Sequence, residues 1–204
     1  MKFYNSIGPN PRMVRMFIAE KGFAVPKVEV DLRGGENRRD PYLKANPSGQ
    51  MPALELDDGT VLAEITAICE YVDEVKKDTP SLIGNTAEER AKTRMWTRRI
   101  DLNIVEPALA GFRYAEGLKL FQNRIRCIPQ AADDLKAIAR EKLAWLDGLV
   151  GDKPFISGAK LTMADIMLFA FVDFLNSVGQ PLDPACKHLT AWFGRMKARP
   201  SAAA

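Results

Sequence analysis

The chain has few of the residues on which metal centres, disulfide frameworks and histidine-based catalysis depend. Its 204 residues include three cysteines and one histidine. Cys69, Cys127 and Cys186 are odd in number and have neither a metal-ligand spacing nor a Cys-x-x-Cys spacing. This pattern excludes a disulfide scaffold and indicates a reducing compartment. No nucleophile or acid pattern accompanies His188, so we interpret it as a structural residue.

Long apolar runs and a strong charge bias are also missing. No stretch of about 18 apolar residues is present, which argues against a membrane-spanning helix. The segment 1–6 lacks the apolar region of a signal peptide. The net charge of +3 comes without the clustered basic stripe that nucleic-acid binding requires. We therefore expect a cytoplasmic protein with no nucleic-acid, membrane or metal partner, and a loose tail at 201–204.

The first 76 residues alternate strand and helix patterns. The hydrophobic periodicity predicts the following elements: strands at 2–4 and 28–32, helices at 11–22 and 41–44, a hairpin at 53–62, and a helix after Ala63. The first strand, helix and strand form a parallel βαβ unit, and the hairpin adds antiparallel strands. This order is a thioredoxin-like layout, which we assign to a first domain at 1–78. Pro80 and Gly84 then mark a linker.

From Thr86 onward the pattern is helical only, and we assign 86–204 to an all-α second domain. Thr86 and Glu89 form a capping box before a long helix, in which Met95, Leu102, Val105 and Leu109 are expected to share one face. Further helices are predicted at 129–150 and 184–199. A second capping box, Thr162 to Asp165, opens a helix at 166–175 that is apolar nearly all round and should be the buried centre of this domain.

Residues 46–72 hold the strongest functional signal. Met51-Pro52 stands before the hairpin, Asp58-Gly59 forms its turn, and Glu64-Ile65-Thr66 begins the next helix. Such a unit leaves backbone groups exposed at the proline and free N–H groups at the helix start. These groups suit the binding of a peptide and of a carboxylate.

Three motifs make the family recognisable: Pro-Ser-Gly-Gln-Met-Pro-Ala-Leu at 47–54, Asp-Gly-Thr-Val-Leu-Ala-Glu-Ile-Thr-Ala-Ile at 58–68, and Leu-Thr-Met-Ala-Asp-Ile at 161–166. Together they resemble the cytosolic glutathione transferase superfamily over nearly the whole chain, as a bacterial member of the Ser/Asn type. The resemblance implies an α/β thioredoxin-like N-terminal domain and an all-α C-terminal domain. It also implies glutathione as co-substrate and a homodimer.

The resemblance further implies how glutathione is held in the first domain. A cis Met51-Pro52 bond would turn the Met51 backbone toward the cysteinyl residue of the tripeptide. Glu64 and the helix start would hold the γ-glutamyl end, although Ile65 replaces the usual serine, and Thr66 could supply a hydroxyl instead. Gln50 would meet the glycyl carboxylate, together with a base from among Arg38, Arg39 and Lys44.

The group that activates the thiol stays open between Ser6 and Asn10. Either could donate a hydrogen bond to sulfur and so lower the thiol pKa. Tyr4 is a weaker alternative because it lies early in the strand. Loop turning and helix capping are equally suitable roles for Ser6 and Asn10. The absence of a cysteine from this loop argues against branches that form mixed disulfides with glutathione.

For the second domain the resemblance implies a site for a small electrophile, and its candidate residues are Trp96, Phe112, Arg113 and Tyr114. The function expected is detoxification-type transfer of the glutathione thiolate to this electrophile. The alternatives are a non-catalytic or regulatory glutathione-binding member and a specialised dehalogenase, ether-cleaving enzyme or isomerase.

Overall fold

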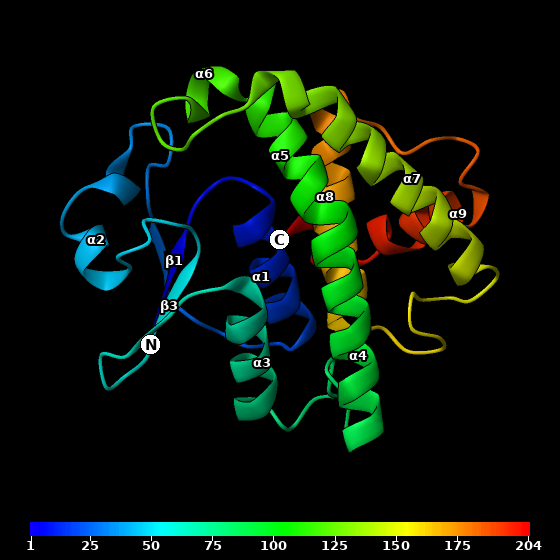
Figure 1. The fold of residues 1–204 in the computed structure, drawn as a ribbon. Coiled ribbons are helices and arrows are strands. Elements are labelled where there is room, and N and C mark those ends of the chain that lie inside the picture. Colours follow the sequence, from blue (N-terminus) through cyan, green and yellow to red (C-terminus); the bar gives the residue numbers. More distant parts are fainter. The chain divides into compact units, whose positions relative to one another are not determined.

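The computed structural model describes all 204 residues, and they form two compact units. Unit 1 comprises residues 1–82 and 200–204, and unit 2 comprises residues 83–199. The elements of unit 1 are β1 (Lys2–Asn5), α1 (Pro9–Glu20), β2 (Lys27–Glu29), α2 (Tyr42–Ala45), β3 (Ala53–Glu55), β4 (Val61–Leu62) and α3 (Ile65–Val75) (Figure 1). The order predicted from the sequence is therefore confirmed, with β2 shorter than its apolar pattern indicated.

The sheet of unit 1 has the strand order β2-β1-β3-β4. β1 pairs with β2 in parallel, and the β3–β4 hairpin is antiparallel to β1 and within itself. This arrangement follows from the connections, since the helix α1 carries the chain back for a parallel strand whereas a tight turn reverses it. The thioredoxin-like layout is confirmed.

The two faces of the sheet are covered differently. α1 and α3 pack together on one face over Phe3 and Leu54, which are fully buried. On the other face Tyr42 of α2 joins a small cluster with Val30 and Met51. Side chains alternate along a strand, so Tyr4, which follows Phe3, faces the opposite side and packs against this cluster. The cluster at α2 thereby fixes the segment that precedes β3.

The last residues of the chain belong to unit 1, so the expectation of a loose tail is wrong. Residues 200–203 form a 3₁₀ turn that packs on α1. Arg12 donates from Nη2 to the carbonyl of Ala202 at 3.0 Å, and the buried Ser201 donates its hydroxyl to Glu20. Residues with no local structural signal are ordered here by bonds to α1.

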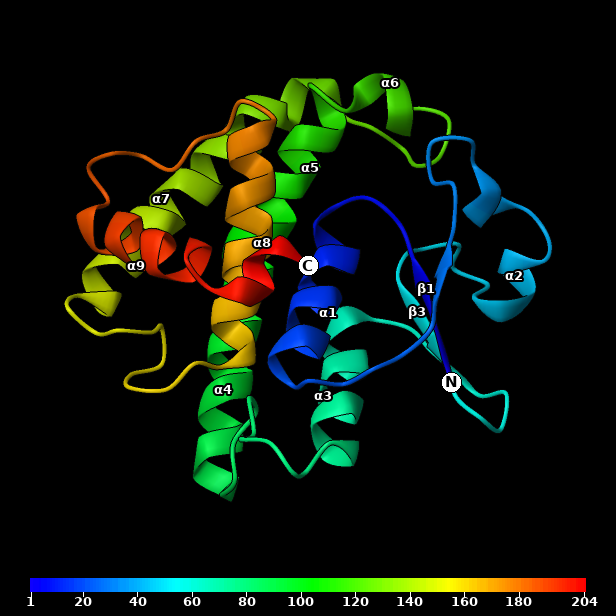
Figure 2. The ribbon, with the colours of Figure 1, turned by 180° about the vertical axis from the view of Figure 1, so that it is seen from behind.

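Unit 2 is entirely helical. Its elements are α4 (Ala87–Ile100), a π-helical turn (Asp101–Val105), α5 (Glu106–Tyr114), α6 (Leu118–Phe121), a 3₁₀ turn (Pro129–Ala131), α7 (Ala132–Val150), α8 (Met163–Ser177) and α9 (Lys187–Lys197). α8 packs against α4 and α9, and α5 packs against α7 (Figure 2). No helix of the chain combines the length and apolar character that crossing a membrane requires.

The long helix formed by α4 and α5 does not bury the face that the sequence indicated. Val105 and Leu109 are buried, but Met95 and Leu102 are exposed. The π-helical turn at Asp101–Val105 contains both Leu102 and Val105, so the change from exposed to buried falls within it. Such a turn contains an extra residue, which rotates the positions after it around the helix axis. Apolar residues before and after the turn therefore do not share a face.

The start of α8 is confirmed as a capping box, and it is more elaborate than predicted. Asp165 is fully buried, and its carboxylate accepts bonds from the Thr162 N–H and hydroxyl at 3.0 and 2.9 Å. It also accepts from the Ile156 N–H at 2.8 Å and from the Trp192 indole at 3.0 Å. Burial raises the pKa of this carboxyl, while the four bonds act in the opposite direction. One side chain thus joins the α8 start to two distant segments.

Candidate functional site

The strand registers bring three segments of unit 1 to one end of the sheet. Tyr4 is opposite Ala53, and Leu54 is opposite Leu62. Continuing these registers by two residues places Ser6 level with Met51 and Glu64 level with Pro52. The end of β1, the start of β3 and the end of β4 therefore meet where α1 and α3 begin. Nearly all the glutathione-site candidates from the sequence lie in this region.

The backbone of Met51 is available for pairing. The Met51-Pro52 bond is cis, as predicted, and so is Asp40-Pro41. Neither the N–H nor the C=O of Met51 has a partner in the structure. The side chain of Met51 is buried in the cluster with Tyr42. An extended peptide could thus pair with this residue as it would with the edge of a sheet.

The start of α3 is also open. Its first intrahelical bond runs from the Ile68 N–H to the Glu64 carbonyl at 3.0 Å, and no side chain caps the helix. The N–H groups of Ile65, Thr66 and Ala67 are consequently free to receive an anion. Glu64 is exposed and is the only residue other than glycine with a positive φ, at 66°. That conformation costs about 1–3 kcal/mol, and such strain is frequent at ligand sites.

The loop before Met51 is held firmly by its own backbone. The carbonyl of Gln50 accepts bonds from the Tyr42 hydroxyl at 2.5 Å and from the Asn46 amide at 2.9 Å. Asn37 donates to the Gly49 carbonyl at 2.6 Å. These bonds leave the exposed side chain of Gln50 unengaged at the edge of the site.

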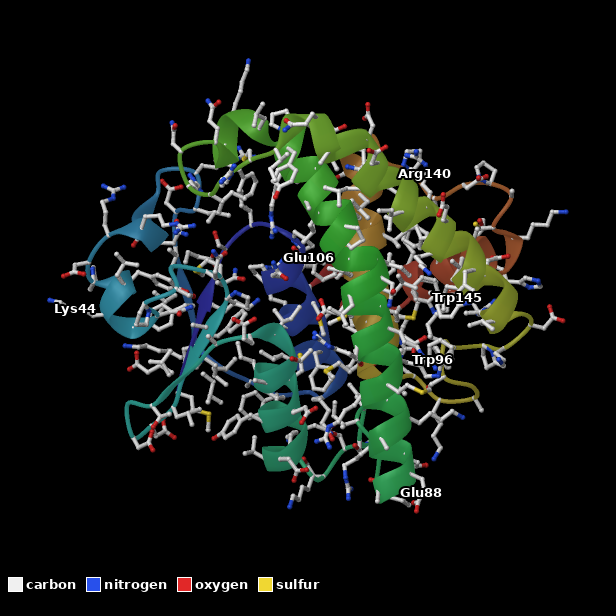
Figure 3. The ribbon with its side chains drawn as sticks, viewed as in Figure 1. Lys44, Glu88, Trp96, Glu106, Arg140 and Trp145 are labelled. Carbon is white, nitrogen blue, oxygen red and sulfur yellow. The ribbon has the colours of Figure 1, made fainter.

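The three candidate bases near this loop differ in their engagement. Arg39 donates to the carbonyls of the glycine pair at 34–35, and Lys44 pairs with Asp40 at 3.3 Å on the outer side of α2 (Figure 3). Arg38 packs its stem against Gly49, and its Nε is buried without a partner. Of the three, Arg38 has the donor capacity left for a ligand.

The loop between β1 and α1 holds the thiol-activation candidates. Ser6 is buried, and its hydroxyl donates to the Val30 carbonyl at 2.7 Å. Tyr4 donates its hydroxyl to Glu55 at 2.7 Å, and burial is the main cause of its raised pKa. Asn10 lies in the first turn of α1, between Pro9 and Pro11, which have no N–H. Its side chain and its N–H have no partner, so Asn10 is the uncommitted donor of this loop.

A polar network behind this loop gave no signal in the sequence. The Arg15 guanidinium donates to the Asn5 side chain at 2.8 Å and to the Ser6 carbonyl at 3.1 Å. Asn5 in turn donates to Glu29 at 2.7 Å. The three side chains come from α1, β1 and β2, and only the parallel pairing of β1 with β2 brings them together.

In unit 2 the electrophile-site candidates fall into two groups. Trp96 is buried on α4, with the Arg99 guanidinium 5.0 Å from its ring. Phe112 lies 16 residues later on the long helix, about 24 Å along its axis. Figure 3 shows Trp96 and Glu106 at different levels of this helix. Trp96 therefore does not share a small-molecule pocket with Phe112.

The other three candidates form a group with α6 and α8. The Phe112 ring packs edge to face on Phe121 and Phe174, with centroids 6.1 and 5.0 Å apart. The Arg113 guanidinium lies 5.8 Å from the Phe121 ring and 4.0 Å from Glu106. Tyr114 follows, half-buried, at the end of α5. This is an aromatic site with one cation beside it.

The cysteines and acidic residues form no further centre. All three cysteines are free thiols, and burial raises the pKa of Cys69 well above its ordinary value. No three His, Cys, Asp or Glu side chains converge in a way that would hold a metal ion.

Comparison with known proteins identifies the family. The glutathione S-transferase N-terminal domain matches residues 7–75, and the C-terminal domain of the same family matches residues 129–195. The chain is 35% identical over 201 residues to glutathione S-transferase 2 of Saccharomyces cerevisiae. The matched region covers 95% of this chain and 84% of the relative. The chain belongs to the glutathione S-transferase family.

Solved structures agree with this assignment. A glutathione S-transferase domain-containing protein from Marinobacter aquaeolei has a TM-score of 0.92 at 37% identity, covering 98% of this chain and 99% of the other. Gtt2 from Saccharomyces cerevisiae has a TM-score of 0.89 at 32% identity, covering 100% and 99%. The thioredoxin-like and helical units are thus the two domains of the family fold.

Proposed function

We propose that this protein is a glutathione transferase that activates the glutathione thiol and transfers the thiolate to a small electrophile. The observation that carries the proposal is that two sets of unpartnered backbone groups lie at the same end of the sheet. One is the N–H and C=O of Met51, and the other is the uncapped start of α3. One suits the peptide backbone of a cysteinyl residue, and the other suits a carboxylate. Glutathione carries both.

The ends of the tripeptide have candidate partners in the same region. The γ-glutamyl carboxylate binds the free N–H groups at Ile65 and Thr66, and Glu64 binds its amine. At the glycyl end, Gln50 and Arg38 receive the second carboxylate. The unpartnered Nε of Arg38 supports this role, because a buried donor without an acceptor is costly.

Asn10 is the group that we propose activates the thiol. A free thiol has a pKa of about 8.5, and donors aimed at sulfur favour the thiolate. Both the side-chain amide and the N–H of Asn10 are uncommitted, and they lie at the positive end of α1. Ser6 would first have to give up its bond to the Val30 carbonyl. Its role is instead to hold the loop.

The electrophile binds at the aromatic group of unit 2, where Phe112 offers an apolar surface and Arg113 a positive charge. A cation favours an acceptor or leaving group that is anionic. We accordingly expect Arg113→Met to reduce kcat/KM for a carboxylate-bearing electrophile about 10-fold more than for its neutral analogue. Equal losses for the two electrophiles would remove Arg113 from this role.

The decisive test compares Asn10→Ala with Ser6→Ala in the conjugation of glutathione to a chromogenic halo-aromatic compound. A hydrogen bond to a charged group contributes about 1.5–3 kcal/mol. Asn10→Ala should therefore lower kcat/KM at neutral pH about 10- to 100-fold, whereas Ser6→Ala should mainly lower stability. Asn123→Ala, on an exposed residue of unit 2, is the matched control. Full activity in Asn10→Ala would transfer the role to another donor.

Binding alone separates an enzyme from a non-catalytic family member. Calorimetry should detect glutathione binding, and N-acetylcysteinylglycine, which lacks the γ-glutamyl charges, should bind more weakly. Binding without conjugation of any electrophile would favour the regulatory alternative. No binding at millimolar glutathione would refute the site.

The remaining parts of the proposal concern the state of the protein. We expect a homodimer in a reducing, cytoplasmic setting, and the three free thiols support the reducing setting. Sedimentation analysis tests the oligomeric state, because a monomer at micromolar concentration would contradict the homodimer.

A further inference from the structure

A polar network of Arg15, Asn5 and Glu29 lies behind the β1–α1 loop. Arg15 reaches back along α1 to the Ser6 carbonyl and to the Asn5 side chain, at 3.1 and 2.8 Å. Asn5 is buried, and its amide donates to Glu29 at 2.7 Å. The Val30 N–H and carbonyl bond to the backbone of Asn5 and to the hydroxyl of Ser6. Residues 5 and 6 are consequently held from two sides, by Arg15 of α1 and by β2 with the residue that follows it.

The residues just after this clamp are left open. Ile7 is half exposed, Gly8 has a φ of 107°, and Asn10 has no partner. The clamp thus ends where the proposed thiol site begins. A donor can position a ligand sulfur precisely only if the backbone behind it is held rigidly, and the bonds to Asn5 and Ser6 provide that support for Asn10.

The charge of Arg15 is also placed to act on that site. Arg15 follows Asn10 by five residues, about 7.5 Å along the helix axis, and its side chain points back toward the first turn. Burial lowers the pKa of the guanidinium, which nevertheless stays charged near neutral pH, while Glu29 opposes this shift and Arg12 adds to it. Lys27 lines the same surface hollow as Arg15.

The other charged groups near α1 are engaged elsewhere. On α3, which packs against α1, Asp73 pairs with Lys21 at 3.0 Å, at the far end of α1 from the first turn. Glu29 is therefore the acid coupled to Arg15, through Asn5. Because Glu29 is exposed, solvent weakens its effect relative to that of the half-buried guanidinium.

We infer that Arg15 is a positioning residue for thiol activation, holding the β1–α1 loop through Asn5 and Ser6 and lowering the pKa of the glutathione thiol by its charge. This inference rests on the proposed function. Two unit charges about 8–10 Å apart, at an effective dielectric constant of about 20–40, change a pKa by about 0.6–1.5. Glu29 moderates the effect by partly neutralising the guanidinium.

The test follows the pH dependence of kcat/KM and the ultraviolet absorbance of the bound thiolate in four variants. Arg15→Met should raise the apparent thiol pKa by about 0.5–1, and Arg15→Lys should keep it near the wild-type value. Glu29→Gln keeps an oxygen for Asn5 but removes the charge, so it should lower the thiol pKa by about 0.2–0.5. Lys77→Met removes an exposed charge near the end of α3 and should change nothing.

Opposite shifts in Arg15→Met and Glu29→Gln would support the inference, because a purely structural clamp would move both variants in the same direction or neither. Equal pKa values in all four variants would overturn it. If Arg15→Met fails to fold, Glu29→Gln and Arg15→Lys decide the question, since a raised thiol pKa in Glu29→Gln also overturns it. Failure of the proposed function is distinct: the wild-type protein would then bind no glutathione or leave its thiol pKa near 8.5.

Discussion

The buried pair of Lys21 and Asp73 offers a quantitative test of how unit 1 is held together. Lys21 is fully buried at the end of α1, and its ammonium lies 3.0 Å from Asp73 on α3. It also donates to the carbonyls of Pro80 and Thr79 at 3.1 and 3.4 Å. Asp73 further accepts bonds from the Ser81 hydroxyl and the Leu82 N–H at 2.5 and 2.9 Å. Two helices and the segment 79–82 meet at this pair.

Lys21→Met keeps the apolar stem and removes the charge. The Asp73 carboxylate then stays buried without its cation, and two carbonyls lose their donor. Breaking a buried ion pair from one side costs about 3–5 kcal/mol. For a chain of this size each kcal/mol lowers Tm by about 2–4 °C, so we expect a loss of about 6–20 °C.

The assay is urea and thermal unfolding of Lys21→Met, Asp73→Leu and the double variant. Removing both charges leaves no unpaired ion. The double variant should therefore lose less stability than the two single variants lose together, by about 2 kcal/mol or more. Lys77→Met, at an exposed pair 3.9 Å long, should cost less than about 0.5 kcal/mol. A single-variant loss below about 1 kcal/mol, or strictly additive losses, would refute the reasoning.

Four further predictions concern three side chains, those of Tyr42, Ile65 and Asp165. Tyr42→Phe removes the bond to the Gln50 carbonyl, so unfolding should cost about 1 kcal/mol less and calorimetry should show weaker glutathione binding; unchanged binding would mean that this bond does not hold the loop. Burial raises the pKa of Tyr42, so its stabilising contribution is complete below pH 10 and is lost as the pH rises through the raised value; urea titrations at alkaline pH should show this loss in the wild type and a smaller one in Tyr42→Phe. Ile65→Ser adds a hydroxyl at the α3 start and should tighten glutathione binding by about 0.5–1.5 kcal/mol, or about 2- to 13-fold in Kd, and weaker binding would exclude a γ-glutamyl carboxylate at that position. Asp165→Ala leaves four buried donors unpaired and should cost at least about 3 kcal/mol in urea unfolding, whereas a loss under 1 kcal/mol would show that water replaces the carboxylate.

The local signals in the sequence identified elements whose cause is itself local. Asp58-Gly59 makes a hairpin because these residues suit its turn, and Thr162 caps α8 because its hydroxyl reaches the third N–H of the same helix. The helix that is apolar on all sides is buried, as its composition required. The order of strands and helices then restricted the topology to a thioredoxin-like unit followed by helices.

Features that depend on contacts between residues far apart in the chain were not predicted from the sequence. The π-helical turn changed which apolar residues of the long helix are buried, and bonds to α1 hold the tail at 201–204 in place. The sequence analysis placed Trp96 and Phe112 in one candidate site for the electrophile, but about 24 Å of helix separates them. Burial at each of these places is a property of the packed molecule.

The sequence by itself predicted the class of the site, because a strand that begins after a proline and a helix that begins after a hairpin offer backbone groups for a peptide and for a carboxylate. Only the tertiary structure decided which side chains remain free to act there. Ser6 and Asn10 are alike as donors in the sequence, but Val30, a residue of another segment, accepts the hydroxyl of Ser6 and nothing accepts from Asn10. A hydrogen donated to one acceptor is lost to another, so the partners brought by the fold decide the chemistry that the residue types leave open.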